Sequence, residues 1–292
     1  MKKIVVVGSA NLDLVYGVDH LPAPGETILA LDFATHPGGK GANQAVAAAR
    51  LGANVSFCGS FGSDGNGEFL WKGMESEGID LSTSTRADCA NGNAAIFVDQ
   101  QGRNQIVVAP NANAMLKPAQ VKAALESASP DLVVAQLEVP LDAVMEAAQA
   151  SVFLLNPAPA QPLPDELIAR CTFIVPNETE TEIITGISPT PENRSAAADW
   201  FISRGAKNVV LTLGSEGCYW KSAGGEEMSI SAEPVTAVDT TAAGDAFVGA
   251  LAHFWTAGYS IPEALAWANR VAGRSVSKAG AQPSLPKISD FS

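Results

Sequence analysis

Short apolar runs alternate along this chain with stretches of helical period. The β-branched run at residues 4–7 has the composition of a strand buried on both faces. Together these patterns predict an α/β fold, in which a mostly parallel sheet is flanked by helices on both faces. Further strands are predicted at 55–58, 132–136, 152–155, 173–175 and 209–213, and helices from the glycines at 38–41 to about 50, then over 64–77, 118–127, 141–150, 165–170, 178–186 and 193–204.

Two segments do not follow this alternation. Apolar runs at 94–98 and 105–108 flank Asp99-Gln100-Gln101-Gly102, which is typical of a hairpin. A third exposed strand is predicted over 27–33, in a region with Pro22, Pro24 and Gly25. We therefore expect one domain over 1–292, with a small β-sheet lid formed by inserted segments at about 14–37 and 89–110.

Composition narrows the classes of function. The 292 residues suffice for one large core, and a net charge of −13 argues against nucleic acid as a partner. No segment approaches the ~20 continuous apolar residues of a membrane span. The four cysteines form no C-x-x-C pair, which is typical of reduced packing residues in a cytoplasmic protein.

The stretch from Asp239 to Gly249 places a loop of small residues directly before a helix, whose apolar face includes Phe247 and Leu251. The first N–H groups of a helix have no intrahelical partner and lie at the positive end of its dipole, so they favour an anion. Asp245 lies at the same end. A base beside an anion site suits phosphoryl transfer to an alcohol. The alternative is that Asp245 only complements the helix dipole.

A second glycine-rich stretch, Gly38-Gly39-Lys40-Gly41, opens the helix that runs to about residue 50. It is not a Walker A loop, because Gly41 stands where Ser or Thr should follow the Lys. No G-x-G-x-x-G occurs, which argues against a dinucleotide-binding dehydrogenase.

Polar residues follow five of the predicted strands. Ligands of open α/β sheets bind at the carboxyl ends of the strands, so these side chains are expected to converge on one pocket. They are Asn11 and Asp13, Gln136 and Glu138, Asn156, Asn177 and Glu180, and Thr212 and Gly214.

Residues 38–45 (GGKGANQA) and 239–247 (DTTAAGDAF) resemble the two signatures of the ribokinase family of sugar kinases. The resemblance runs almost end to end and includes 156–159 (NPAP), 176–180 (PNETE), 212–214 (TLG) and 280–284 (GAQPS). It implies ATP-dependent phosphorylation of D-ribose at its 5-hydroxyl to give D-ribose 5-phosphate. It also implies a homodimer formed through the lid.

The resemblance assigns roles to individual positions. Asp245 would be the base that accepts the hydroxyl proton, and the amides of Ala242, Ala243, Gly244 and Asp245 would form the anion hole. The sugar would be held by Asn11, Asp13, Gly39, Lys40, Asn43 and Glu138, with Asp245.

The same resemblance implies three cofactors. ATP would be bound by Asn177, Thr212, Gly214, Ser215, Gly217, Gly244 and Asn269. Mg²⁺ would be organised by Glu180 through water, since Mg²⁺ takes few protein ligands. K⁺ would be bound by Asp239, Thr241, Ser275, Lys278, Gly280 and Ser284, several through backbone carbonyls.

Two alternatives stay open at this point. The substrate could be another small sugar or a nucleoside, such as 2-deoxyribose, fructose or a pyrimidine nucleoside. A homologue that binds sugar or nucleotide without turnover is the other alternative, although Asp245, Gly244 and Asn177 are all present.

Overall fold

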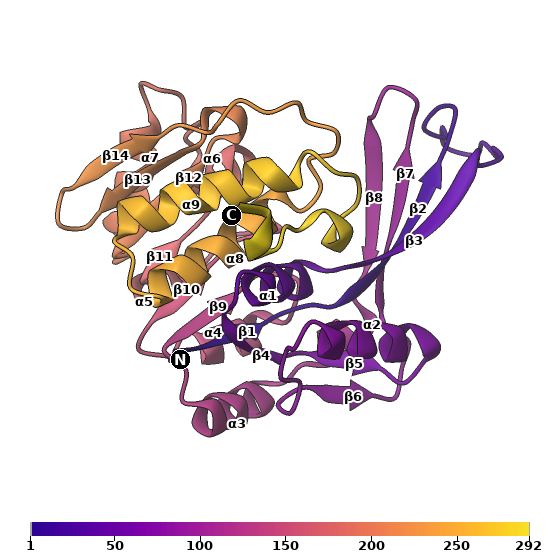
Figure 1. Ribbon diagram of the computed structural model, residues 1–292, viewed down its shortest axis with the longest axis horizontal. Coiled ribbons are helices and arrows are strands. Elements are labelled where there is room, and N and C mark those ends of the chain that lie inside the picture. Colours follow the sequence, from indigo (N-terminus) through magenta and orange to yellow (C-terminus); the bar gives the residue numbers. More distant parts are fainter. Residues whose placement is uncertain (1, 292) are drawn as a thin grey trace.

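The computed structural model describes residues 2–291 and is organised around an eight-stranded sheet (Figure 1). Its strand order is β14-β13-β12-β11-β10-β9-β1-β4, and the strands from β12 to β4 are parallel. The predicted mostly parallel sheet is therefore confirmed. The strands are β1 (Lys3–Val7), β4 (Asn54–Cys58), β9 (Leu132–Ala135), β10 (Phe153–Leu155), β11 (Phe173–Ile174), β12 (Asn208–Thr212), β13 (Cys218–Ser222) and β14 (Glu227–Ile230).

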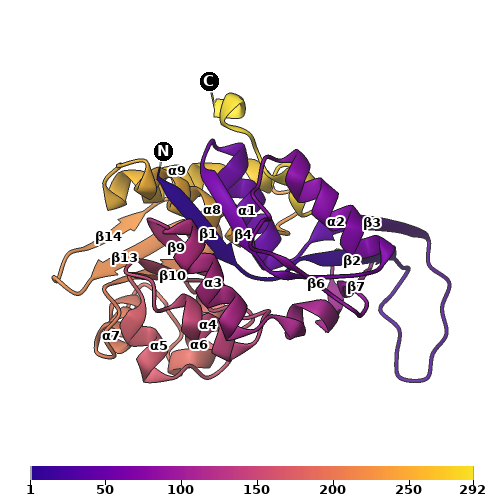
Figure 2. The same ribbon diagram turned by 90° about the horizontal axis from the view of Figure 1, so that it is seen from below.

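Helices cover both faces of this sheet (Figure 2). Side chains alternate along β1, so that Ile4 and Val6 enter one apolar core while Val5 and Val7 enter the other. One core is shared with α1 (Lys40–Arg50), α2 (Gly65–Ser76), α8 (Ala243–Thr256) and α9 (Ile261–Ser275). The other face carries α3 (Pro118–Ala128), α4 (Leu141–Ala147), α5 (Asp165–Arg170), α6 (Glu178–Thr185) and α7 (Arg194–Ile202).

A separate four-stranded sheet, the small sheet, projects beside the main body (Figure 1). Its order is β3-β2-β7-β8, and exposed apolar side chains occur on both of its faces. Ile106 and Val108 share the face of Asp13, and Phe33 and Val107 lie on the other, because neighbours along a strand point to opposite sides. Its strands are β2 (Asn11–Gly17), β3 (Asp32–Gly38), β7 (Gly92–Val98) and β8 (Asn104–Ala109).

One sequence prediction about this region was wrong. The strand expected over 27–33 begins instead at Asp32, and the residues before it from 18 to 31 form an irregular loop. Its position follows the antiparallel register with β2, which pairs Tyr16 with Phe33. Asn11 and Asp13 follow β1, as expected, and belong to a further strand, β2, that was not predicted.

The sequence patterns did not identify β13, β14 or α9. The first two form an antiparallel extension of the main sheet, and α9 packs along α8. The remaining short elements are β5 (Ser60–Gly62), β6 (Thr85–Ala87) and the 3-10 turns Asn111–Met115, Gly214–Glu216, Gln282–Ser284 and Ile288–Phe291.

Within residues 2–291, no helix combines the length and hydropathy needed to cross a bilayer. The four cysteines are unpaired, and Cys58, Cys171 and Cys218 are buried.

Candidate active site

The start of α8 lines a cavity of about 190 Å³ at the carboxyl ends of the parallel strands. Ala242 precedes the helix in the left-handed conformation, at φ 62°, and no side chain caps the helix start. Ala243 N–H donates to Thr240 O at 3.2 Å, whereas the amides of Ala242, Gly244 and Asp245 have no hydrogen-bond partner in the described part of the chain. Three of the four amides that the resemblance implied thus remain available for an anion.

The Asp245 carboxylate is buried and held by two side-chain amides from α1. Asn43 Nδ2 donates to Oδ2 at 2.9 Å, and Gln44 Nε2 donates to Oδ1 at 3.0 Å. The two helices approach closely at Gly249 of α8, where a Cβ would lie 2.6 Å from Ala47 Cβ and 2.7 Å from Gln44 O. This glycine lets α1 bring both amides to Asp245.

The first turn of α1 is fixed against β1 and the residues after β9. Glu138 Oε2 accepts from Ser9 Oγ at 2.6 Å and from the Lys40 amide at 3.0 Å. Gly39 has φ 90°, and a Cβ there would lie 2.6 Å from Asn11 N. The glycines of residues 38–41 therefore serve close backbone packing here, and they leave Lys40 on the wall of the cavity.

Asn11 and Asp13 belong to β2 and lie outside the lining of the cavity. Asn11 Oδ1 accepts from Asn113 Nδ2 at 2.7 Å, which leaves the Asn11 amide hydrogens for another acceptor. Asp13 is 9% exposed and lies over Gly38, where a Cβ would meet its carboxylate. Burial raises the pKa of Asp13 to about 7, with further contributions from the charges of Glu138 and Asp245.

Lys40 is the cation of this acidic site. Burial would lower the pKa of Lys40, but the charges of Asp245, Glu138 and Glu180 outweigh it, so its pKa is raised. Lys40 is therefore protonated and partly neutralises the surrounding carboxylates. Burial raises the pKa of Glu180 as well, against the effects of the Asn177 amide and Lys40.

Residues assigned to the nucleotide divide into two groups. Asn177, Glu180 and Thr212 line the cavity with the start of α8. Asn177 and Glu180 also form a reciprocal capping box at the start of α6, with bonds of 2.8 and 2.9 Å, so both have a structural role there.

The second group lies outside the cavity lining. Gly214 and Ser215 belong to the exposed turn after β12, and Gly217 follows at φ 97°, where a Cβ would clash with Ile230 O. Asn269 of α9 is buried and donates to Ile230 O at 2.8 Å. Its side chain thus connects α9 to β14, and its assignment to ATP stays a prediction.

The positions assigned to K⁺ lie on two segments, 239–241 and 275–284, that Asp239 connects. Asp239 Oδ1 accepts from Thr241 N and Oδ2 accepts from Gly280 N, both at 2.8 Å. Within residues 2–291, the carbonyl oxygens of Asp239, Thr241, Lys278 and Gly280 accept no hydrogen bond. Ser275 and Ser284 are buried, and their hydroxyls donate to nearby backbone carbonyls.

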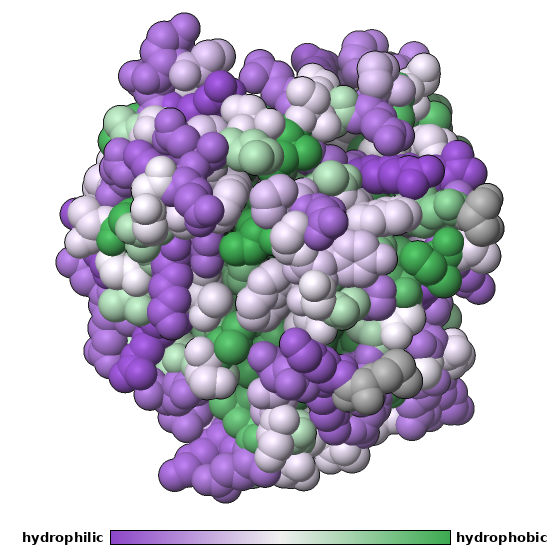
Figure 3. Space-filling view, turned by 60° about the vertical axis from the view of Figure 1, so that its left-hand side comes forward, coloured by the Kyte–Doolittle hydropathy of each residue, from purple (hydrophilic) through white to green (hydrophobic). Residues whose placement is uncertain are grey.

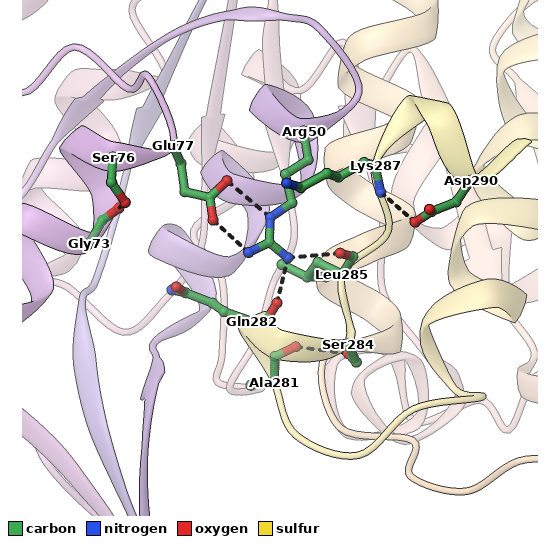
Figure 4. A network of polar contacts seen from close by, with 10 residues as sticks. All are labelled: Arg50, Gly73, Ser76, Glu77, Ala281, Gln282, Ser284, Leu285, Lys287 and Asp290. Atoms are coloured by element: carbon green, nitrogen blue, oxygen red, sulfur yellow. Dashed lines mark hydrogen bonds and ion pairs between the residues drawn. The ribbon is translucent and has the colours of Figure 1, made fainter.

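Arg50 holds the segment after Gly280 against α1 (Figure 4). Its Nη1 donates to the carbonyls of Gln282 and Leu285, both at 2.7 Å. The rest of the guanidinium forms a bidentate pair with Glu77 after α2. One side chain therefore connects the end of α1, the end of α2 and the C-terminal segment.

Three residues of the site were not assigned a role from the sequence. Ser9 bonds Glu138, Gln44 bonds Asp245 and Asn113 bonds Asn11. Gln44 lies inside the GGKGANQA stretch, so its position beside Asn43 was a usable signal. No sequence signal pointed to Ser9 or Asn113, because their contacts depend on tertiary structure.

A family model described as pfkB family carbohydrate kinase matches residues 1–288. The chain is 40% identical over 305 residues to a ribokinase of Schizosaccharomyces pombe, covering 99% of this chain and 96% of that protein. It is 37% identical over 297 residues to a deoxyribokinase of Salmonella typhi, covering 99% and 97%. It spans 55% of a bifunctional ribokinase/ribose-5-phosphate isomerase A of Fructilactobacillus sanfranciscensis, with 40% identity over 98% of this chain.

Solved structures agree with this assignment of the fold. The structure of Arabidopsis thaliana ribokinase complexed with ribose and ATP matches with a TM-score of 0.89 and 31% identity, over 99% of this chain and 96% of that one. A ribokinase from Thermotoga maritima matches with a TM-score of 0.92 and 35% identity, over 100% and 99%.

Proposed function

The chain belongs to the pfkB family of carbohydrate kinases, and from this membership we propose that it transfers the γ-phosphoryl group of ATP to the 5-hydroxyl of D-ribose. The observation that carries the proposal is the position of Asp245. Its buried carboxylate lies at the N-terminus of α8, beside the unpaired amides of Ala242, Gly244 and Asp245 and next to the side chains of Lys40 and Asn43, which are assigned to the sugar. This arrangement provides a base and an anion site within one turn of helix.

The sugar side has the chemistry that a polyol needs. Carboxylates of Asp13 and Glu138 accept from hydroxyls, whereas Lys40 donates. Asn43 Oδ1 is buried and has no hydrogen-bond partner in the described part of the chain, which suits a ligand hydroxyl as donor. Asp245 accepts the proton of the attacking hydroxyl, while the amides of Gly244 and Asp245 bind the transferred phosphoryl group.

The residues present fit Mg²⁺. Glu180 lines the cavity and uses Oε2 to accept the Asn177 amide, so the carboxylate also offers an oxygen for a metal-bound water. Mg²⁺ would neutralise charge on the phosphates of ATP, and one carboxylate suffices for it. Within residues 2–291, no group of three or more Asp, Glu, His or Cys side chains is arranged so that it could hold a metal ion, so we assign no further carboxylate to the metal.

The residues also fit K⁺. The four carbonyl oxygens without partners, those of Asp239, Thr241, Lys278 and Gly280, belong to segments that the Asp239 carboxylate holds together. Carbonyl oxygens are suitable ligands for a weakly hydrated monovalent cation. K⁺ would stabilise the loop before α8 and so the orientation of the anion site.

The exposed surface of the small sheet suits a lid and a dimer interface. Its exposed apolar side chains, Phe33, Ile106, Val107 and Val108, lack cover in the described chain, and exposed apolar patches mark interfaces. By contrast, the face of the main body in Figure 3 is mostly polar, with only scattered apolar residues. We assign 1–292 to one cytoplasmic kinase domain that dimerises through the small sheet, whose strands fall in or next to the segments at about 14–37 and 89–110.

A second candidate substrate is 2-deoxy-D-ribose, because a deoxyribokinase is 37% identical over 99% of this chain. The two sugars differ by a single hydroxyl. A site built to bond that hydroxyl leaves buried polar groups unpaired when it is missing.

The experiment that tests the function is ADP release from ATP and Mg²⁺ with D-ribose, 2-deoxy-D-ribose, D-fructose or uridine, each with and without K⁺. We expect ribose to give the highest kcat/KM and K⁺ to accelerate it. A higher kcat/KM for another acceptor would reject ribose as the substrate. Absence of turnover with every acceptor would reject the kinase function.

A further inference from the structure

A row of buried side-chain amides runs from the end of β9 to the start of α8. Gln136 Nε2 donates to Gln44 Oε1 at 2.6 Å, and Gln44 Nε2 donates to both Asp245 Oδ1 and Asn156 Oδ1 at 3.0 Å. Asn156 Nδ2 in turn donates to Val175 O at 2.9 Å. Gln44 is 1% exposed and Gln136 is 0% exposed, so water does not compete for these bonds.

The direction of every bond in this row follows from Asp245. An ionised carboxylate only accepts, so Gln44 must present its NH₂ group to Asp245. Its oxygen then faces Gln136, which must donate. A reversed Gln44 amide would place its oxygen against the carboxylate and its NH₂ group against the Gln136 NH₂ group, so both contacts would become repulsive.

The two carboxylate oxygens of Asp245 differ in their surroundings. Oδ2 is bonded to Asn43, which is assigned to the sugar, and so this oxygen lies on the substrate side. Oδ1 is bonded to Gln44, which belongs wholly to the buried row. Gln44 therefore fixes one oxygen of the carboxylate independently of the substrate.

We propose that Gln44 is a positioning residue for the reaction, and that it orients the Asp245 carboxylate toward the substrate hydroxyl through the row of buried amides. The inference rests on the proposed function of Asp245 as the base. It assigns Gln44 no contact with the sugar. Loss of Gln44 should consequently change kcat and leave the KM for the sugar nearly constant.

The test compares Gln44→Leu, Gln44→Glu and Gln136→Met with the unaltered protein, using the acceptor on which that protein is most active. For Gln44→Leu we expect kcat to fall about 10- to 100-fold, because one charge-assisted hydrogen bond is lost. The sugar KM should change less than about threefold, and Gln136→Met should show a smaller fall in kcat because it frees only the far end of the row.

Gln44→Glu keeps the shape of the side chain but replaces the NH₂ donor that faces Asp245 with a carboxylate oxygen. It places two carboxylates about 3 Å apart, and such a pair resists full ionisation. We expect the acid limb of the kcat–pH profile to move to higher pH by about one unit or more. Asp13, Lys40 and Glu180, whose charges couple to Asp245, remain in every variant, so a difference between profiles reports Gln44.

Asn208→Leu is the matched control for a general loss of stability. The Asn208 side chain also makes two partly buried hydrogen bonds, to Thr172 O and from Trp220 Nε1. It lies at the start of β12, at the strand end opposite the site. The Asn208→Leu substitution should lower the melting temperature without moving the kcat–pH profile. An unchanged kcat and acid limb in both Gln44 variants would overturn the proposal, as would a rise in sugar KM at constant kcat. Absence of activity in the unaltered protein would instead reject the function itself.

Discussion

The sugar side and the phosphate side of the site are held by different means. On the sugar side Asn11, Asp13 and Asn43 are buried. The Asn113–Asn11 bond connects the turn Asn111–Met115 to the small sheet, and the Asn43–Asp245 bond connects α1 to α8. On the phosphate side residues 240, 241 and 244 are exposed, and the loop depends mainly on the Asp239 carboxylate. The sugar side is thus largely preformed, whereas the phosphate side is fixed by few bonds.

This difference predicts that the two sides of the site have different functions. A buried set of side chains held in fixed positions discriminates hydroxyl patterns, because a missing hydroxyl leaves a polar group unpaired. An exposed loop with free amides accommodates a nucleotide that must enter and leave. Changes on the sugar side should therefore alter substrate affinity, and changes on the phosphate side should alter turnover.

Asp245 lies where the two sides meet, and its loss should have the largest effect. Asp245→Asn keeps the shape but removes the base, so we expect kcat to fall by about 10² to 10⁴ with ribose and ATP binding largely retained. Steady-state ADP release and calorimetric titration measure the two quantities. Loss of ribose binding with turnover retained at saturation would contradict the role as base.

The anion site can be tested by removing one amide. Gly244→Pro eliminates an N–H at the second position of α8, a position where α9 of the same chain already carries Pro262. We expect kcat to fall about 10² to 10³-fold. Gly244→Ala is the control, because a Cβ there meets no atom within 4 Å. Equal kcat in both variants would show that this amide does not stabilise the transferred group.

Asp13 should affect sugar affinity, with a dependence on pH. Because its pKa is raised to about 7, the carboxylate that accepts from hydroxyls forms only as the pH rises through 7. The KM for ribose should therefore fall between pH 6 and 8. Asp13→Asn should raise KM about 10- to 100-fold and make it independent of pH in this range. A pH-dependent KM in Asp13→Asn would assign the titration to another group.

The raised pKa of Asp13 also predicts how the stability of the folded protein depends on pH. The folded pKa of Asp13 lies above its unfolded value of 3.8, so the folded state binds the additional proton between pH 4 and 7. This stabilisation is present at low pH and is lost as pH rises through 7, with a maximum change of roughly 4 kcal/mol. Urea unfolding at pH 5 and 8 should accordingly show a smaller decline for Asp13→Asn than for the unaltered protein.

The smallest effect is expected from the loop of the phosphate side. Asp239→Ala removes the acceptor for the Thr241 and Gly280 amides, so the loop should lose its fixed shape. We expect kcat to fall about tenfold at saturating ATP, with an unchanged KM for ribose. The K⁺ concentration for half-maximal activation should rise in parallel. A changed ribose KM at constant kcat would contradict the separation of the two sides.

The sequence by itself determined the alternation of strands and helices, the glycine-rich start of α1 and the loop before α8. These are local properties, because strand and helix periods and glycine stretches are visible within a dozen residues. Residues that follow parallel strands also had to meet at one edge, so the joint position of Asn177, Glu180 and Thr212 beside Asp245 was predictable.

Only the tertiary structure decided which groups touch Asp245 and which side chains remain free. The approach of α1 to α8 at Gly249 brings Gln44 to Asp245, and the register of β2 with β3 moves the predicted strand to Asp32. The raised pKa of Asp13 likewise depends on burial and on carboxylates more than 100 residues away in the sequence. Such contacts depend on packing between distant segments, and no local pattern encodes them.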